Sequence, residues 1–373
     1  MSEELRPEAA QAAIDYCYEQ GWSDGLPIVP PTEQMVAAFI ERSGRDPEQV
    51  LSTAEHLDRS CTVLQAAINA VMAGCLPEYF PTILAAIDGL FGDPEVGWPA
   101  EMVSTSGPAP LVIVNGPVRH EIGLNCTGSL FSPGFRANAT IARTLRLIGL
   151  NVFGLEPHVL EQATQGTPCK WSMCFGENEE DSPWEPLHVS RGFSREQSTV
   201  TTVLCHGTMN VDIRHTHDAE RLLLSMAAEM SYVNPSYQTS SIALVMGPEH
   251  AHLLAGAGWS KERVKRFLWE HYGQTLGALR SYGRGELEAS QLAERAGTYV
   301  LVEQARPERR IPGSERMRDE QFIHFADSPE SILLVVAGAN NAGVSTVVPL
   351  SSLPGLANHG KPVTVPILQG VSE

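Results

Sequence analysis

The stretch Leu111-Val112-Ile113-Val114-Asn115-Gly116-Pro117 decides the fold class of this chain. A continuous apolar run closed by Asn-Gly-Pro predicts a buried strand that feeds a helix. The run Ile242–Met246 ends in Gly247-Pro248 in the same way, and a third run, Ile332–Val336, ends in a loop that contains Gly338. Because such strands alternate with helical segments along the chain, the sequence predicts α/β architecture.

Helical patterns fill the chain between residues 7 and 91. Helices are expected at 7–20, 33–43, 47–57, 62–73 and 77–91, and later at 138–151, 218–232 and 261–272, with Gly and Pro between them. The predicted fold is therefore α/β, with a helical N-terminal region followed by two α/β lobes that contain short buried strands. We place the N-terminal lobe at 1–195 and the C-terminal lobe at 196–373, and the two Gly-Pro corners are consistent with an ancient duplication.

Composition restricts the class of protein. The 26 basic and 44 acidic residues give a net charge of −18, which argues against nucleic acid and anionic membranes as partners. The 7 cysteines are scattered and form no Cys-x-x-Cys pair, so we expect free thiols in a reducing compartment. No signal peptide and no apolar run of membrane-spanning length occurs, and we expect a cytoplasmic protein.

Cys75 is the first candidate for chemistry. Apolar residues recur at helical spacing up to Cys75, Gly74 is a helix stop, and Pro77 begins a second helix, so the thiol lies at a corner between two helices. Proximity to the free N–H groups of the second helix favours the thiolate, whereas the carbonyl end of the first helix disfavours it. Cys75 is therefore either a nucleophile or redox thiol, or a small buried apolar residue.

A candidate anion site precedes the helix expected at 138–151. Asn138 is placed to cap that helix, and Arg136 and Arg143 lie seven residues apart on roughly one face. Free N–H groups together with guanidinium groups bind carboxylate or phosphate, although a cap flanked by surface arginines is the alternative. The chain has no Rossmann glycine fingerprint and no Walker loop, so no nucleotide cofactor is indicated.

The acidic run Glu177-Asn178-Glu179-Glu180-Asp181 supplies candidates for proton transfer. Burial beside a like charge or an apolar wall would raise the pKa of Glu177 or Glu179 enough for acid/base catalysis, whereas a solvated loop is the alternative. His120 follows the first Gly-Pro corner and is expected near a crevice at the strand ends, where α/β sheets tend to bind ligands.

Four residues within one short segment are candidate metal ligands. These are His206, Asp212, His215 and His217. In an extended segment the two imidazoles at 215 and 217 lie on one side, and His206 or Asp212 would complete a three-ligand site. A polar connection that leads into a helix is the alternative.

Several motifs resemble an uncharacterised bacterial family whose members accompany small proteins with a UGSC motif. The matching segments include Gly21-Trp22-Ser23-Asp24-Gly25-Leu26-Pro27, Val114-Asn115-Gly116-Pro117, Arg136-Ala137-Asn138-Ala139-Thr140 and Ser182-Pro183-Trp184-Glu185-Pro186. The UGSC partners resemble the selenoprotein subunit of glycine and proline reductases, so the resemblance implies thiol or selenol chemistry. Asn115 and Trp184, which lie within these motifs, are further candidates for substrate binding.

Three hypotheses follow. The first is a cytosolic oxidoreductase or lyase, or a subunit of one, that acts on a small anionic substrate by thiol-assisted reductive or lyase chemistry at a carbon–heteroatom bond with a UGSC-type partner. In it Arg136 and Asn138 hold the substrate, Cys75 is the nucleophile or redox thiol, and Glu177 or Glu179 moves protons. The second is a metal-dependent hydrolase or lyase, and the third is a non-catalytic binding or scaffold subunit. A homo-oligomer is compatible with all three.

Overall fold

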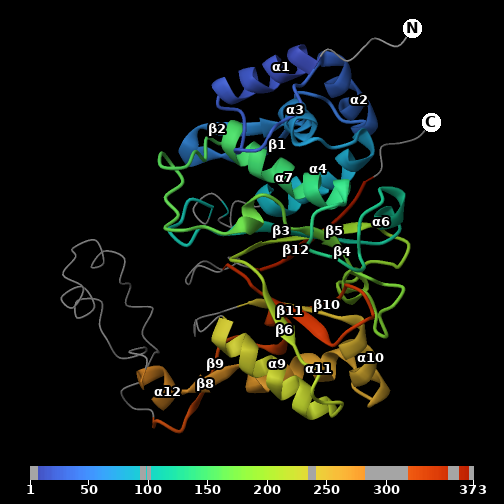
Figure 1. The fold of residues 1–373 in the computed structure, drawn as a ribbon, viewed down its shortest axis with the longest axis vertical. Coiled ribbons are helices and arrows are strands. Elements are labelled where there is room, and N and C mark those ends of the chain that lie inside the picture. The colour runs from blue at the N-terminus through green and yellow to red at the C-terminus, as the bar shows by residue number, and fades with distance from the viewer. Residues whose placement is uncertain are drawn as a thin grey trace, which may run out of the picture.

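The protein has an α/β fold with a helical N-terminal part, as the sequence predicts. The computed structural model describes residues 7–92, 98, 102–233, 241–281, 318–351 and 361–368. Two four-stranded sheets lie face to face, and a layer of helices covers the outer face of each, so the order of layers is helix, sheet, sheet, helix (Figure 1).

The first sheet has the strand order β12-β5-β3-β4. Its strands are β3 (Ala109–Asn115), β4 (Cys174–Gly176), β5 (Thr199–Cys205) and β12 (Val363–Pro366). The second sheet has the order β10-β7-β11-β6, built from β6 (Met209–Asp212), β7 (Ile242–Met246), β10 (Ile332–Val336) and β11 (Val344–Pro349). Each sheet contains one parallel pair, β3 with β4 and β7 with β10, and its other pairs are antiparallel.

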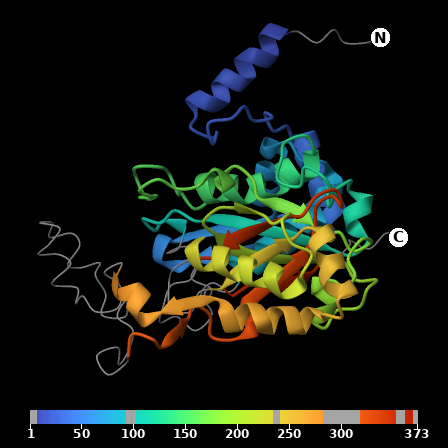
Figure 2. The ribbon, with the colours of Figure 1, turned by 60° about the horizontal axis from the view of Figure 1, so that its bottom comes forward.

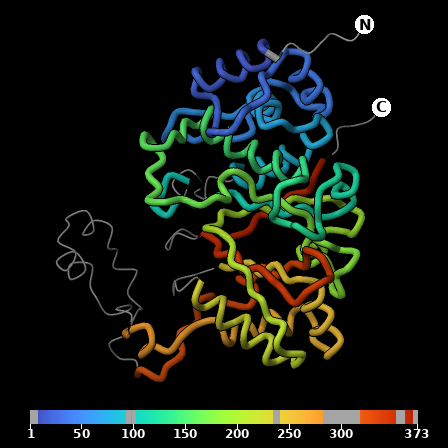
Figure 3. Tube along the Cα trace, viewed as in Figure 1, coloured from blue at the N-terminus to red at the C-terminus, as the bar shows by residue number. Residues whose placement is uncertain are grey.

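The two sheets are built in the same way. In the first, β3 leads through α6 (Val118–Glu121) and α7 (Arg136–Asn151) to β4 and β5. In the second, β7 leads through α10 (Pro248–Gly256) and α11 (Lys261–His271) to β10 and β11. In both cases the next strand along the chain joins the other sheet. The strand β6 follows β5 but pairs with β11, and β12 follows β11 but pairs with β5 (Figure 3).

Alternating side chains of the central strands fill three separate cores. In β3, Leu111 and Ile113 face the second sheet, whereas Val112 and Val114 face the helices. Side chains of β7 and β10 alternate in the same way. One set lies in the core between the two sheets, and the other set packs against the helices α9 (Ala219–Val233) and α11. A strand buried on both faces has no polar side, which explains its continuous apolar sequence.

The N-terminal helices cover the outer face of the first sheet. Of these, α4 (Phe80–Phe91) and α7 pack directly on the sheet, and α2 (Glu33–Ser43) and α3 (Val63–Ala73) pack against them. The first helix of the chain is α1 (Pro7–Glu19). Figure 2 shows that α1 projects from the rest of the molecule. The smaller elements are α8 (Leu187–Ser190), α12 (Leu276–Ser281), the hairpin strands β8 (Gly273–Thr275) and β9 (Phe322–His324), and the 3₁₀ helices η1 (Glu55–Leu57), η2 (Pro77–Tyr79), η4 (Pro168–Lys170) and η7 (Pro329–Ser331).

The helix predicted at 47–57 is wrong. This segment forms β1 (Val50–Ala54) and η1, and β1 pairs antiparallel with β2 (Arg59–Thr62). Ser52 and Ala54 are buried while Thr53 between them is exposed, which is the alternation of a strand. Ser52 Oγ also donates a hydrogen bond to the Phe91 carbonyl at 2.7 Å, so a contact from outside the segment stabilises the strand.

The division at residue 195 stays a prediction. Two strands that follow it in sequence, β5 and β12, pair within the sheet that also contains β3 and β4. The chain therefore crosses between the two sheets more than once.

Candidate functional site

A buried polar cluster lies where the parallel strands β3 and β4 end. Val114 pairs with Gly176, so the next residues, Asn115 and Glu177, lie side by side. Asn115 Nδ2 donates hydrogen bonds to Glu177 Oε2 at 2.6 Å and to Glu179 Oε1 at 3.0 Å. Asn115 and the two carboxylates, which the sequence predicted in different segments, are thus in contact at the carboxyl end of a parallel strand pair.

Glu177 connects the two sheets. Its side chain is fully buried, and its Oε2 also accepts a hydrogen bond from the Leu187 N–H at 2.7 Å. Its Oε1 lies 3.5 Å from the N–H of Val336 in β10 and 4.0 Å from Lys261 Nζ at the start of α11. Lys261 is itself buried and donates to the Glu185 carbonyl at 2.9 Å. The side chain of Glu177 is therefore surrounded in the interior by several N–H groups and a nearby cation.

Arg119 organises the other two carboxylates. Its guanidinium is buried and donates two hydrogen bonds to Glu180, at 2.9 and 3.1 Å, while Nε lies 3.2 Å from Glu179 Oε1. His120 Nε2 lies 2.9 Å from Glu180 Oε1. Burial opposes ionisation of Glu180, but the hydrogen bonds from Arg119 and His120 outweigh it and lower the pKa of Glu180 to about 2.

His188 is the most enclosed member of the group. Its side chain is fully buried on α8, and neither ring nitrogen has a hydrogen-bond partner within the described residues. Nδ1 lies 3.9 Å from Glu179 Oε1, too far for a hydrogen bond. We call Asn115, Arg119, Glu177, Glu179, Glu180, His188 and Lys261 the carboxylate cluster.

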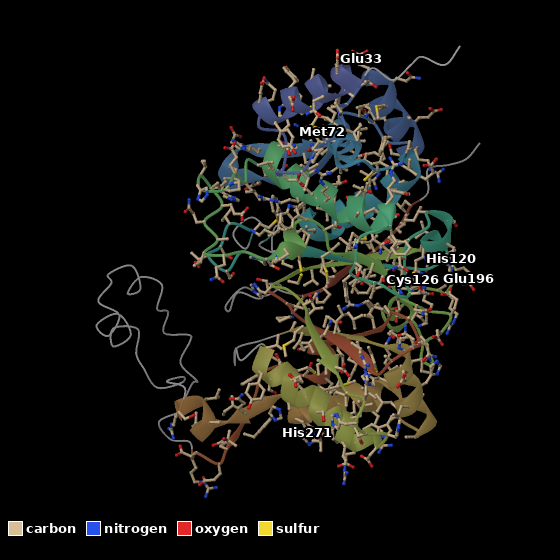
Figure 4. The ribbon with its side chains drawn as sticks, viewed as in Figure 1. Glu33, Met72, His120, Cys126, Glu196 and His271 are labelled. Atoms are coloured by element: carbon tan, nitrogen blue, oxygen red, sulfur yellow. The ribbon has the colours of Figure 1, made fainter. Side chains whose placement is uncertain are left out.

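The thiol beside this cluster belongs to Cys126. Arg119 Nη1 lies 3.8 Å from Cys126 Sγ, and a side chain on Gly176 would come within 2.3 Å of the same sulfur. Burial raises the pKa of Cys126, although the neighbouring Arg119 charge opposes this. Figure 4 labels His120 and Cys126 at the end of the first sheet where α6 lies.

Cys75 lies at a corner between two helical segments, as predicted, but it is buried. Its Sγ is 3.3 Å from Thr144 Oγ1 on α7, and burial raises the pKa of its thiol to about 11. The two arginines predicted to bind an anion at the start of α7 donate hydrogen bonds to backbone carbonyls, and Arg143 does so to those of Leu26 and Pro27 at 3.2 and 3.1 Å. Arg136 Nε donates to the Gly74 carbonyl at 2.8 Å, and Arg143 forms an ion pair with Asp24 at 2.7 Å.

Asn138 does not cap the helix. The N-cap position of α7 is Phe135, which supplies no side-chain hydrogen bond to the helix start. Asn138 is buried in the first turn, where its Nδ2 donates to the carbonyls of Asn125 and Cys174, each at 3.1 Å. The Asn125 carbonyl also accepts a hydrogen bond from the Gly176 N–H. The side chain of Asn138 therefore helps to fix the position of β4, which leads into the carboxylate cluster.

A hollow of about 460 Å³ opens at the start of α7. We call it the α7 hollow. Its wall includes two of the residues predicted to bind substrate, Asn138 and Arg143, and also Thr140, Ser172 and Cys174. Cys75 lies close behind this wall, because a side chain on its neighbour Gly74 would lie 3.7 Å from Thr140 Cγ2.

The α7 hollow and the carboxylate cluster occupy opposite ends of β4. Cys174 begins this strand and lines the hollow, whereas Glu177 follows its last residue. At about 3.3 Å per strand residue, the two positions are about 10 Å apart. Glu177 and Glu179 do not line the hollow, so Cys75 and these carboxylates approach each other only through β4 and Asn138.

Other predicted residues lie elsewhere. Trp184 packs against the core of the second helical layer, and its Nε1 donates to the Trp259 carbonyl at 3.0 Å. Asp212 pairs with Arg214 at the surface, His215 and His217 are exposed, and His206 is half-buried. Within the described ranges no group of three or more His, Cys, Asp or Glu side chains is arranged to hold a metal ion. Nothing in this part of the chain supports the metal alternative.

Four residues of this region were not predicted from the sequence, namely Arg119, Cys126, His188 and Lys261, and Glu180 was named only as part of the acidic run. Arg119 could have been found by the argument that selected His120, because both follow the first Gly-Pro corner. Cys126, His188 and Lys261 carry no local signal, since their contacts come from segments distant in sequence.

A larger hollow of about 640 Å³ contains none of the predicted site residues. It is lined mainly by apolar side chains of α2 and α3, among them Val36, Ile40, Leu64, Ile68 and Met72. Figure 4 labels Met72 within the N-terminal helical layer.

No protein-family model matches this chain, and no curated protein matches it. In the part of the chain that the structure describes, no helix combines the length and apolar character needed to cross a membrane.

Proposed function

We propose that the chain is a cytoplasmic oxidoreductase or lyase, or a subunit of one, that binds a small anionic substrate in the α7 hollow. The reaction is thiol-assisted reduction or elimination at a carbon–heteroatom bond. A UGSC-type protein is its partner, in line with the sequence resemblance, and the carboxylate cluster exchanges protons with the site.

The observation that carries this proposal is the uncapped start of α7 at a hollow walled by a buried thiol. Phe135 provides no side-chain cap, so first-turn N–H groups of a sixteen-residue helix remain available to an anion. Arg136, at the same helix start, has no carboxylate partner among the described residues. Cys174 lines the hollow and is 5% exposed. The first turn of α7 and a sulfur group thus border one cavity of small-molecule size, while Arg136 lies at the helix start outside its lining.

The state of the thiols supports a need for the partner. Burial raises the pKa of Cys75 to about 11 and also raises the pKa of Cys174 strongly. Both groups are therefore protonated at neutral pH and are poor nucleophiles. In this proposal the attacking thiolate or selenolate comes from the UGSC-type protein, and this chain binds the substrate and provides protons.

Anion binding is tested by giving α7 a cap of its own. Phe135→Asp places a carboxylate at the N-cap, where it satisfies the free N–H groups and competes with an added anion. The matched control is Phe135→Ala, which removes the same ring without adding a cap. Titration calorimetry with acetate, phosphate and sulfate should show at least tenfold weaker binding to Phe135→Asp than to Phe135→Ala.

Two results would contradict the proposal. One is equal affinity of these variants for every anion, and the other is no measurable anion binding by the unmodified protein. If binding is found, turnover is measured after mixing with a purified UGSC-type protein. The Phe135→Asp mixture should then lose turnover while the Phe135→Ala mixture keeps it.

A further inference from the structure

A second hollow, with a volume of about 350 Å³, lies next to the α7 hollow. Its wall includes Arg146, Glu161, Lys170 and Trp171, and we call it the basic hollow. Arg146 lies on α7, Lys170 is the last residue of η4, and Trp171 follows it directly. The basic hollow is therefore built on the same helix as the α7 hollow, closer to the C-terminal end of that helix.

Two cations of the basic hollow share one carboxylate. Glu161 is buried, and its two oxygens form ion pairs with Arg146, at 2.7 Å, and with Lys170. A guanidinium and an ammonium together have more N–H donors than one carboxylate can accept. Among the described residues, Glu161 is nevertheless the one partner of both side chains, which are mostly buried. Burial lowers the pKa of Lys170, so a further anion beside it would stabilise the charged ammonium.

The charge of this region is positive although the whole chain has a net charge of −18. The other carboxylate in the wall of the basic hollow belongs to Asp24, and Arg143 binds both of its oxygens, at 2.7 and 2.8 Å. The basic hollow and this ion pair together contain two carboxylates and three cations, which leaves one positive charge. An anionic group bound in the basic hollow would neutralise it.

Trp171 separates the two hollows. Its side chain lines both of them and is 53% exposed. The ion pair between Asp24 and Arg143 also lies on this boundary, because Asp24 lines the basic hollow and Arg143 lines the α7 hollow. Apolar side chains, among them Leu26 and Phe131, contribute to the wall of the α7 hollow. A ligand that spans both hollows would therefore pass an indole ring and apolar side chains between its two ends.

We propose that the substrate of the α7 hollow is a linear dianion, with an anionic group at each end and an apolar middle. This inference rests on the function proposed above, in which one anionic group binds at the start of α7. The second group binds Arg146 and Lys170 in the basic hollow, and the apolar middle lies against Trp171. Asn138, which lines the α7 hollow, and Arg146 are eight residues apart on α7, so the two anionic groups are separated by about 12 Å.

The experiment compares ligands that differ in one property each. Decanedioate, when extended, has its two carboxylates about this far apart. Its monomethyl ester has the same length but a single charge, and butanedioate is too short to reach both hollows. Titration calorimetry with the full chain should show that decanedioate binds at least about tenfold more tightly than either of the others, because hydrogen bonds to charged groups contribute this much.

Lys170→Gln tests the second anion site. Glutamine removes the charge but keeps an N–H donor for Glu161, so the advantage of decanedioate over its monomethyl ester should fall below about threefold. Lys361→Gln is the matched control, since this exposed lysine lies outside the walls of both hollows. It should keep the full advantage.

Trp171→Ala covers the case in which Lys170→Gln folds poorly, because the Trp171 ring is half exposed and belongs to none of the three cores. Loss of the indole should weaken the binding of decanedioate and of its ester by at least about threefold each. The binding of acetate, which has no apolar middle, should stay unchanged.

The outcomes separate this inference from the function on which it rests. If acetate binds and Phe135→Asp weakens it, but decanedioate has no advantage over its ester, the proposed function stands and the linear dianion is wrong. An advantage that Lys170→Gln keeps in full would also overturn the inference, because the second anionic group would then bind elsewhere. If none of these anions binds, the proposed function fails and this inference fails with it.

Discussion

At the level of single residues, His188 has a position that packing alone does not explain. Its imidazole is fully buried on α8, and its two nitrogens lack hydrogen-bond partners in the described part of the chain. Leaving a buried polar group without a partner costs about 1–3 kcal/mol. Its Nδ1 is 3.9 Å from Glu179 Oε1, which is too long for a hydrogen bond.

We therefore expect His188→Leu to stabilise the protein. Leucine has a similar volume and no unpaired polar atom, so the free energy of unfolding should rise by about 1–3 kcal/mol in urea titrations. His252→Leu is the control, since His252 pairs with Asp181 at the surface and its replacement should change stability by less than about 1 kcal/mol. A large loss of stability in His188→Leu would show that the imidazole has a structural role.

The ionisation of Glu180 makes the free energy of unfolding depend on pH in the acid range. Its pKa in the folded protein, about 2, lies below the unfolded value of about 4.3, so its ionised form stabilises the fold above pH 4.3. This stabilisation is lost as the pH falls toward 2. Because the side chain is 56% exposed, screening by solvent limits it to about 1 kcal/mol.

Glu180→Gln should accordingly lower the unfolding free energy by about 1 kcal/mol at pH 7. The difference from the unmodified protein should shrink as the pH falls below 4, measured by urea unfolding at each pH. Glu41→Gln, at an exposed position on α2, should show no such trend. A pH-independent difference for Glu180→Gln would mean that its ionisation is not coupled to folding.

The sequence predicted single residues where a local pattern marks them. The acidic run and the Gly-Pro corner select Glu177, Glu179 and His120, and these do lie in one region. The groups that determine their chemistry, Lys261 and His188, come from α11 and α8 and have no local signature. Likewise, burial of Cys75 depends on its contact with α7, which the sequence of its own helix does not contain.

At the level of secondary-structure elements, the fully buried strands were the easiest to predict. The apolar runs that became β7 and β10 have no polar side, because one face meets the other sheet and one meets helices. The segment 47–57 was wrongly predicted as a helix because its strand character comes from pairing with β2 and from the contact of Ser52 with α4. The edge strand β12 escaped prediction because its four residues are only half-buried.

The end of β12 nevertheless anchors the first core. Ile367, directly after this strand, is 8% exposed, belongs to that core and donates its N–H to the Ser198 carbonyl. We expect Ile367→Ala to lower the unfolding free energy by about 2–5 kcal/mol. The neighbouring Leu368 is 67% exposed, so Leu368→Ala should change it by less than about 0.5 kcal/mol. Equal effects of both variants would show that β12 does not dock on β5 in solution.

At the level of the whole molecule, the exchange of edge strands joins the two sheets into one structure. The first sheet takes β5 and β12 from the sequence after residue 195, and the core between the sheets takes side chains from both. A sheet that loses two of its four strands exposes apolar side chains on both faces and unpaired N–H and C=O groups along a new edge. Neither half is expected to be stable without the other.

This leads to a test of the division at residue 195. A fragment of residues 1–195 should show no cooperative thermal transition by circular dichroism, because its β3 would lack its antiparallel partner β5 along seven residue pairs. The full chain, cleaved through a protease site inserted at the exposed residues Arg195 and Glu196, is the matched control. It has the same break but keeps both parts together, so it should stay associated and unfold in one transition. If the 1–195 fragment instead unfolds cooperatively on its own, the N-terminal lobe is an independent domain and β5 and β12 are additions to a sheet that is already stable.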